Sequence, residues 1–196
     1  MGEISHVYVD MDGVLCSFSQ GVLRLFGSEE PELDDLLCEG WDGLPAVINR
    51  GRPSWAHVTD EQMMRAVRDA GHQFWADLPV LPWAYRLIGQ LERSGVDYAL
   101  LTTPAGGESA MGKFQWVLKH LPHMERRVIL ARDKWRLAAP GRLLIDDGGH
   151  NVYAWEMHDG QALHWPQPHN IGGVVPPAAL DAAVIHAEKT LADLLR

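Results

Sequence analysis

Five short apolar, β-forming runs alternate with helical stretches along most of this chain. The runs cover residues 4–10, 97–102, 127–130, 142–146 and 161–164, and helical patterns cover 83–94, 109–120, 151–158 and 177–195. Such alternation is typical of a parallel sheet with helices wound on both faces. Because 46% of the 196 residues are hydrophobic, the chain can bury the core of one ordinary domain. We therefore expect an α/β fold built on a Rossmann-like, doubly wound parallel sheet.

The interval 17–76 does not follow this alternation. It is helix-prone, with candidate helices at 17–26, 31–38 and 59–70. Glycines and prolines interrupt it at Gly40, Gly43, Pro45, Gly51 and Pro53. We expect a small helical cap inserted after the first strand. Residues 1–16 and 77–196 would then form the core.

The first strand runs directly into Asp10-Met11-Asp12-Gly13. Ligands of open α/β sheets bind at the carboxyl ends of the strands. Two carboxylates this close repel each other unless a cation or a proton lies between them, and Mg²⁺ prefers oxygen ligands. The motif therefore predicts a magnesium site, although the same sequence would also be expected if one aspartate only capped the following helix.

Three further runs also end in polar groups. The second ends at Thr102 and Thr103, Lys134 follows the third, and the fourth ends at Asp146 and Asp147. Each alone fits a turn or an exposed charge equally well. In a parallel sheet, however, all these ends meet at one edge. Carboxylates, a hydroxyl and a lysine that converge there are what phosphoryl transfer requires.

Four motifs carry a resemblance to the haloacid dehalogenase superfamily of phosphatases. They are Asp10-Met11-Asp12-Gly13-Val14, Leu100-Leu101-Thr102-Thr103, Asp133-Lys134 and Ile145-Asp146-Asp147. Within it the chain resembles the 5'(3')-deoxyribonucleotidase family, also in Phe74–Leu78, Leu81-Pro82, Lys113–Val117 and His169-Asn170. The resemblance covers most of residues 4–170, and it is loosest between Phe18 and Phe74.

The resemblance implies a role for each motif residue. Asp10 would be the nucleophile and a Mg²⁺ ligand, and Asp12 the general acid and base with its backbone carbonyl on the metal. Thr102 and Lys134 would hold the transferring phosphoryl group. Asp147 would bind the metal directly, with Asp146 supporting it or acting through water, and Lys113 would add a second positive contact to the phosphate.

Two positions depart from the family pattern. Thr103 stands where serine is usual, which keeps a hydroxyl for phosphate binding. Gly148-Gly149 replaces an Arg-Pro-type continuation, which changes the loop after the acid pair.

The implied activity is a Mg²⁺-dependent phosphomonoesterase that acts through an aspartyl-phosphate. The expected substrate is a nucleoside monophosphate, in particular a pyrimidine deoxyribonucleotide. One alternative is another small phosphate ester such as a sugar phosphate, and another is a non-catalytic binding or regulatory protein of the same fold. Phe18, Trp41 and Trp75 are candidates to line the leaving-group pocket, although aromatic residues of a cap more often pack its seam with the core.

The amino-acid composition disfavours some classes of binding partner for this chain. The net charge of −9 disfavours a long nucleic-acid polymer, and no apolar run approaches the roughly 20 residues of a membrane span. The first residues show no secretory leader, and the two cysteines, Cys16 and Cys38, show no metal or redox spacing. We expect a cytoplasmic protein, with a homodimer as one candidate assembly.

Two sequence features that would indicate other activities, a phosphate loop and a zinc site, are weak. The segment 107–114 nearly matches a nucleotide-binding phosphate loop, but Phe114 occupies the position that needs a hydroxyl. No pair of the ten histidines has the helical spacing of a zinc protease site. His169 would face the active site if the loop before it folds over that site.

Overall fold

The computed structural model describes residues 3–31, 43–171 and 176–196. Its centre is a sheet of five strands in the order β3-β2-β1-β4-β5, and every neighbouring pair is parallel. The strands are β1 (His6–Val9), β2 (Asp97–Thr102), β3 (Val128–Leu130), β4 (Arg142–Asp146) and β5 (Gln161–His164). The parallel α/β fold expected from the alternating pattern is therefore confirmed.

The register of the central strands determines where the strand ends lie. Val9 of β1 is level with Leu100 of β2 and with Ile145 of β4. Asp10, which follows β1, and Asp146, the last residue of β4, are therefore neighbours at this end of the sheet. This edge of the sheet carries every strand-end motif of the sequence.

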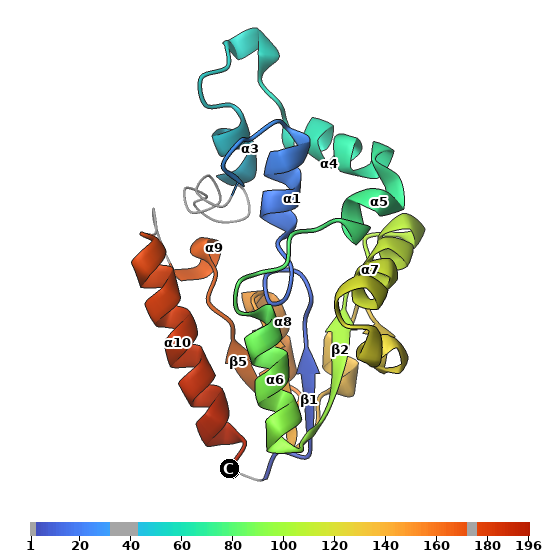
Figure 1. Ribbon diagram of the computed structural model, residues 1–196, viewed down its shortest axis with the longest axis vertical. Helices are drawn as coiled ribbons and strands as arrows, with labels where there is room; N and C mark the ends of the chain where they lie inside the picture. Colours follow the sequence, from blue (N-terminus) through green and yellow to red (C-terminus); the bar gives the residue numbers. More distant parts are fainter. Residues whose placement is uncertain (1–2, 32–42, 172–175) are drawn as a thin grey trace.

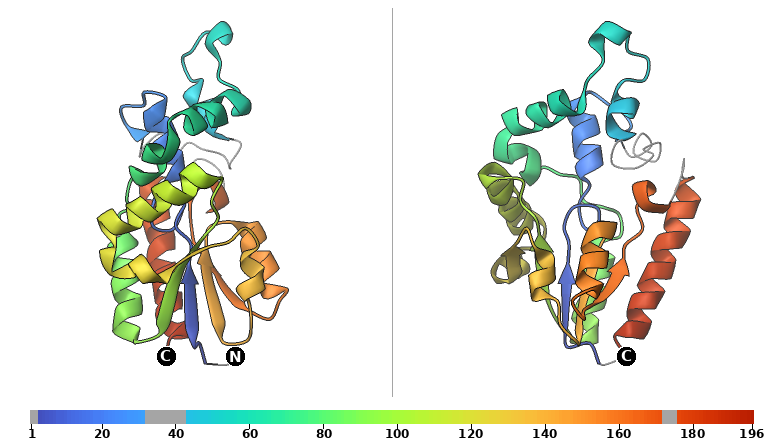
Figure 2. Two further views of the ribbon diagram at one scale, coloured as in Figure 1. Left: turned by 90° about the vertical axis from the view of Figure 1, so that its right-hand side faces the viewer. Right: turned by 180° about the vertical axis from the view of Figure 1, so that it is seen from behind.

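Helices cover both faces of the sheet. On one face, α6 (Ala84–Ser94), α7 (Gly107–His120) and α10 (Pro177–Leu194) share a buried cluster with Val7 and Val9. On the other face, Trp155 of α8 (Gly149–Glu156) packs against Tyr8 and Leu144. Figure 2 shows α8 in front of the sheet when the molecule is seen from behind.

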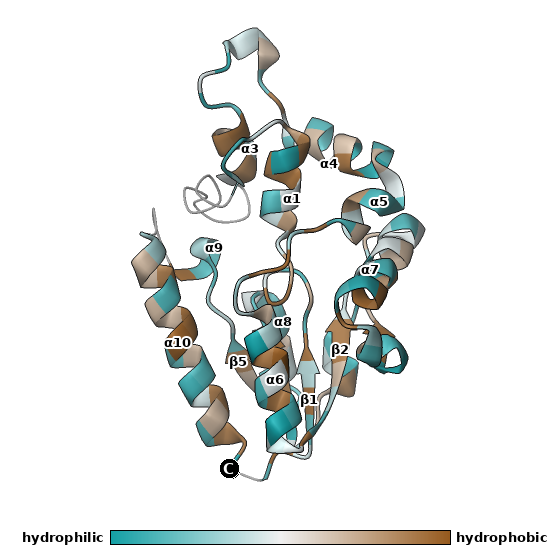
Figure 3. Ribbon diagram, viewed as in Figure 1, coloured by the Kyte–Doolittle hydropathy of each residue, from teal (hydrophilic) through white to brown (hydrophobic). Residues whose placement is uncertain are grey.

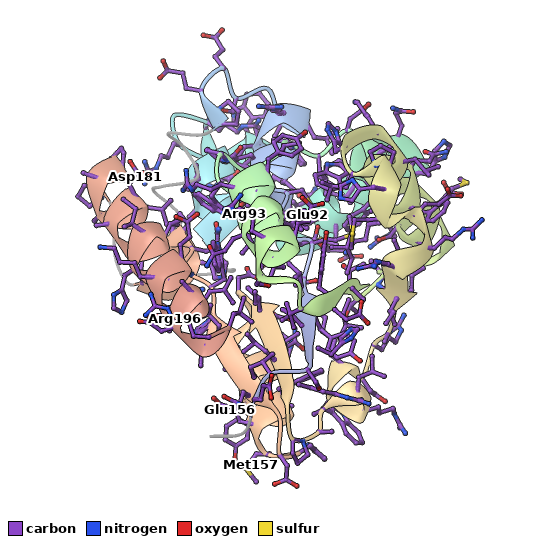
Figure 4. The ribbon with its side chains drawn as sticks, turned by 60° about the horizontal axis from the view of Figure 1, so that its bottom comes forward. Glu92, Arg93, Glu156, Met157, Asp181 and Arg196 are labelled. Carbon is purple, nitrogen blue, oxygen red and sulfur yellow. The ribbon has the colours of Figure 1, made fainter. Side chains whose placement is uncertain are left out.

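The surface helices have mixed composition. Figure 3 shows both hydrophobic and hydrophilic residues along α6 and α10, as expected for helices that bury one side. In Figure 4, α10 extends between Asp181 and Arg196, well away from Glu156 and Met157 at the end of α8. Short helices η2 (Pro122–Arg127) and η3 (Lys134–Leu137) lie in the connections on either side of β3, and α9 (Pro168–Ile171) lies between β5 and α10. In the described part of the chain, no helix has both the length and the hydropathy needed to cross a bilayer.

A group of helices stands beyond the carboxyl ends of the strands (Figure 1). It comprises α1 (Phe18–Leu25), α3 (Gly43–Ile48), η1 (Ser54–Ala56), α4 (Asp60–Asp69) and α5 (Gly71–Ala76). Two predicted helices, 17–26 and 59–70, correspond to α1 and α4, and the third, 31–38, lies almost wholly outside the described residues. Helix α4 begins with a capping box, in which the side chains of Thr59 and Gln62 each accept a hydrogen bond from the other's backbone N–H.

The interpretation of Gly43 and Pro45 as interruptions was wrong, because both residues lie in α3. A proline in the first turn of a helix removes no intrahelical hydrogen bond, so Pro45 is compatible with this helix. Helix α5 was also not predicted. It is short, and it begins at Gly71, whose φ of 64° lies in the left-handed region.

These helices join the core at two places. The chain crosses outward at Cys16 and returns at Val80, and these two crossings pair in antiparallel fashion. Helix α5 also packs on α7 at Gly112, where an added Cβ would lie 2.2 Å from the His72 carbonyl oxygen. Only glycine permits this approach. We propose that the helical segment 17–76 is a cap on a core formed by 1–16 and 77–196.

Candidate active site

Lys134 links two aspartates at the edge of the sheet. Its Nζ lies 2.8 Å from Asp10 Oδ1 and 2.7 Å from Asp146 Oδ2, and the side chain is only 2% exposed. Burial lowers the pKa of Lys134, but Asp10 and Asp146 raise it by more, so the net pKa lies above its usual value. The lysine is therefore charged at neutral pH.

Asp146 is completely buried and fixed by hydrogen bonds. Its Oδ1 accepts from the backbone N–H of Gly148 at 2.8 Å and from Asn151 Nδ2 at 3.1 Å. Burial raises the pKa of Asp146, and the neighbouring Asp10 raises it further, whereas Lys134 and Asn151 lower it. The sequence interpretation did not include Asn151. An amide in the first turn of the helix after an acid pair is the signal that could have identified it.

Asp147 lies beside Asp146 and is held by the loop after β5. Its Oδ2 lies 3.1 Å from His169 Nε2, and its backbone carbonyl accepts from Asn170 Nδ2 at 3.0 Å. His164 Nε2 lies 2.9 Å from the same carbonyl oxygen. Burial raises the pKa of Asp147 to about 6, although the hydrogen bond from His169 opposes this rise. The structure thus places His169 at the site, and it adds His164 and Asn170, which were not predicted.

Gly13 makes room for Asp147. Its φ is +74°, and a Cβ built on it would lie 2.1 Å from Asp147 Oδ2. Any larger residue at position 13 would displace the carboxylate. This close approach explains why glycine follows Asp12 in the first motif.

The acidic cluster fits a hard divalent cation. Asp10, Asp146 and Asp147 are all buried, and each presents an oxygen within 4.8 Å of the others. Among the described residues this is the one group of three or more His, Cys, Asp or Glu side chains arranged to hold a metal. When ionised, these three carboxylates carry three negative charges, and Lys134 contributes one positive charge. The remaining charge of two units matches a divalent cation bound through oxygen ligands.

Asp12 is paired with a second buried lysine. Lys113 of α7 forms an ion pair with Asp12 and donates to Thr102 Oγ1 at 2.7 Å and to the Thr103 carbonyl oxygen at 3.1 Å. Burial lowers the pKa of Lys113, but Asp12 and Asp10 raise it to a net value above the usual one. The ammonium group therefore ties the acid of the first motif to the hydroxyl of the second. Its contact with a phosphate stays a prediction.

A cavity of about 380 Å³ opens at this edge of the sheet. The residues that line it include Asp10, Asp12, Thr103, Lys134 and Asp147, together with Arg132, Trp135 and His150. The Thr103 hydroxyl donates to the Ala131 carbonyl oxygen at 2.9 Å, so it is engaged in holding β2 near the end of β3.

Of the predicted leaving-group residues, Phe18 and Trp75 do not line this cavity. Phe18 and Trp75 are buried and stack with their ring centroids 5.5 Å apart. Lys113 Nζ lies 5.5 Å from the centroid of the Trp75 ring, so the pair adjoins the Asp12 side of the site. Trp41 lies outside the described residues. The segment 107–114 forms the first two turns of α7, so it is a helix rather than a phosphate loop.

Comparison with known proteins agrees with this geometry. Residues 3–173 match the family model described as "5' nucleotidase, deoxy (Pyrimidine), cytosolic type C protein". The human protein named "5'(3')-deoxyribonucleotidase, cytosolic type" is 32% identical over 171 residues, which is 80% of this chain and 79% of that protein. The mouse protein named "5'(3')-deoxyribonucleotidase, mitochondrial" is 31% identical over 145 residues, which is 72% of this chain and 63% of that protein.

Solved structures share the fold. A haloacid dehalogenase family hydrolase from Deinococcus radiodurans, with bound phosphate and sodium, superposes with a TM-score of 0.54 at 14% identity and covers 97% of this chain and 96% of its own. A CbbY variant from Rhodobacter sphaeroides, in complex with xylulose-(1,5)bisphosphate, gives 0.53 at 16% identity, with coverage of 92% and 95%.

The fold, together with these relatives, defines a phosphatase of the haloacid dehalogenase superfamily. Because the family model matches most of the chain, the chain belongs to the deoxy (pyrimidine) 5'-nucleotidase family of cytosolic type C. It is a phosphoric monoester hydrolase of the 5'-nucleotidase type.

Proposed function

We propose that this protein is a Mg²⁺-dependent phosphomonoesterase that hydrolyses deoxyribonucleoside and ribonucleoside monophosphates through an aspartyl-phosphate. The observation that carries the proposal is the convergence of Asp10, Asp146 and Asp147 within 4.8 Å of one another, with the Lys134 ammonium group paired to Asp10 and Asp146. The names of the relatives, which are deoxyribonucleotidases, support a nucleotide as the substrate.

The first step transfers the phosphoryl group to Asp10. A carboxylate oxygen of Asp10 attacks phosphorus, and the bond between phosphorus and the ester oxygen breaks. The electron pair leaves with that oxygen, which takes a proton from Asp12 and departs as the nucleoside hydroxyl. Lys134, 2.8 Å from Asp10 Oδ1, stabilises negative charge on the phosphoryl oxygens.

The second step restores the enzyme. Asp12 removes a proton from water as the water oxygen attacks phosphorus. The bond between phosphorus and Asp10 breaks, which releases inorganic phosphate and the Asp10 carboxylate. Asp10 and Asp147, together with the Asp12 backbone carbonyl, would hold Mg²⁺, and Asp146 would support them. When bound, Mg²⁺ offsets the repulsion between these carboxylates and the phosphate.

The cap residues would recognise the leaving nucleoside. Phe18 and Trp75 present a stacked aromatic pair next to the Asp12 side of the site. A base could stack on such a pair. This assignment and the contribution of Trp41 are proposals, as are a cytoplasmic location and a homodimer.

A substrate panel with metal controls tests the proposed function. Purified protein is assayed on deoxyribonucleotides, ribonucleotides, sugar phosphates and p-nitrophenyl phosphate, after EDTA treatment and after Mg²⁺ is returned. We expect the highest kcat/KM for deoxyribonucleotides and activity only with Mg²⁺. Preference for sugar phosphates would overturn the nucleotide assignment. Inactivity on every ester under both conditions would favour a binding protein.

A further inference from the structure

Cys16 lies against the proposed acid and base of the reaction. Its Sγ is 3.6 Å from Asp12 Oδ1, and the residue is fully buried. The backbone fixes the position of Cys16, because its N–H donates to the Met11 carbonyl at 3.0 Å and its carbonyl accepts from Gly13 N–H at 2.7 Å. The side chain therefore has a defined direction toward Asp12.

The two oxygens of Asp12 have different partners. Lys113 donates to Oδ2, and the Cys16 thiol donates to Oδ1. An ordinary cysteine thiol has a pKa of about 8.5. The sulfur therefore carries its proton at neutral pH, where it acts as a weak hydrogen-bond donor rather than as a nucleophile.

We infer that Cys16 is a positioning residue that holds the Asp12 carboxyl group in the orientation for proton transfer to the leaving oxygen. The inference rests on the proposed function, because it assigns Asp12 the role of acid in the first step. Lys113 alone would fix one oxygen and leave the carboxyl group free to rotate about its bond to Cβ. The thiol removes this freedom from the opposite side.

This role makes a prediction that a purely structural role does not. A nucleoside leaves as a strongly basic alkoxide and needs a proton from Asp12, whereas p-nitrophenolate is a weak base and leaves without one. The constant kcat/KM includes substrate binding and the steps up to departure of the leaving group, so it contains this proton transfer and excludes the later hydrolysis of the aspartyl-phosphate. Loss of positioning should affect nucleotides selectively, whereas a loosened fold should affect both esters alike.

The experiment compares Cys16→Ala and Cys16→Ser on a deoxyribonucleoside monophosphate and on p-nitrophenyl phosphate, with Mg²⁺ present. For Cys16→Ala we expect kcat/KM to fall about tenfold on the nucleotide and to stay within about twofold on the aryl ester. Cys16→Ser keeps a donor and should recover most of the loss. Val14→Ala, a buried truncation in the same loop, is the matched control and should lower both constants in equal proportion.

Three results would overturn the inference. They are an equal loss on both esters for Cys16→Ala, no loss on either, or a selective loss that serine does not repair. If Cys16→Ala fails to fold, Cys16→Val removes the donor at nearly constant volume and takes its place. A wild-type protein that hydrolyses neither ester would overturn the proposed function, and the inference would fall with it; an active wild type with an equal loss overturns the inference alone.

Discussion

The site has two halves, each built around a buried lysine, and the lysines have different partners. Lys134 bridges two carboxylates, Asp10 and Asp146, on the side where the metal would bind. Lys113 joins one carboxylate, Asp12, to the hydroxyl of Thr102. In the proposed mechanism, the first arrangement balances charge around the phosphoryl group, and the second orients Asp12, the group that moves protons. The same residue type thus serves two tasks according to its neighbours.

The largest expected effect comes from removing the nucleophile of the Lys134 half. Asp10→Asn should lower phosphatase activity by on the order of ten-thousandfold, because an amide cannot form the aspartyl-phosphate. Hydrolysis of p-nitrophenyl phosphate measures the loss, and circular dichroism checks the fold. Asp69→Asn, an exposed change on α4, should retain activity. A folded Asp10→Asn protein with wild-type turnover would contradict the assigned role.

Replacing each lysine by methionine tests the two halves of the site separately. Lys134→Met should lower kcat/KM roughly a thousandfold, because charge on the phosphoryl oxygens loses its partner. Without metal it should also lose about 3 kcal/mol of unfolding free energy, since Asp10 and Asp146 become unpaired buried charges. Mg²⁺ should restore part of this stability because the cation supplies the missing charge.

Lys113→Met is the matched comparison for the same measurement. Its partner Asp12 lies on the other half of the site, so Mg²⁺ should restore much less of its stability. Urea unfolding of both variants, with Mg²⁺ and with EDTA, gives the two recoveries. Equal recoveries would show that the halves are not distinct.

A smaller loss, about a hundredfold in kcat/KM, is expected for Gly13→Ala. The new Cβ would meet Asp147 Oδ2 at 2.1 Å and would push the carboxylate away from Asp10. Gly27→Ala is the control, because Gly27 also has a positive φ, +84°, but open space around it. The control should cost only about 1 kcal/mol of stability and no activity. Similar activity losses in both variants would rule out displacement of Asp147 as the cause.

The last effect changes stability and its pH dependence in the metal-free protein, without a direct test of activity. The folded pKa of Asp147, about 6, lies above its usual value of 3.8, so the folded state binds the proton more tightly. The raised pKa stabilises the folded state fully below pH 3.8, and this stabilisation is lost as pH rises through 6. The free energy of unfolding that is lost over this range is about 3 kcal/mol. Asp147→Asn should lack this contribution.

Denaturant unfolding in EDTA between pH 3.5 and 7 measures the difference between the two proteins. The wild type should lose stability relative to Asp147→Asn over this range. A difference that stays constant, or one of opposite sign, would contradict the raised pKa.

The sequence predicted the parts of the site that are covalently next to a strand. Asp10, Thr102 and Asp146 each end an apolar run, and the register of a parallel sheet brings such ends together. Asn151 and Asn170 were not predicted to be site residues, because each reaches the site from a helix, α8 or α9. Their hydrogen bonds depend on how these helices are placed relative to Asp146 and Asp147.

For Lys113, the sequence predicted that the residue lies at the site but not which partner its side chain contacts. Its place in the motif region was clear from the sequence, but its direction depends on how α7 is rotated. That rotation follows from the close packing of Gly112 on α5, a helix that the sequence pattern did not reveal. Contacts between distant helices therefore decide which partner the lysine meets.

Acid-quench trapping tests the central claim most directly. The wild-type protein is mixed with Mg²⁺ and excess deoxyribonucleotide, quenched in acid during turnover, digested, and examined by mass spectrometry. The proposed mechanism predicts one phosphoryl group on the peptide that contains Asp10, released by hydroxylamine and absent from Asp10→Asn. Full turnover with the phosphoryl group on another residue would contradict the mechanism.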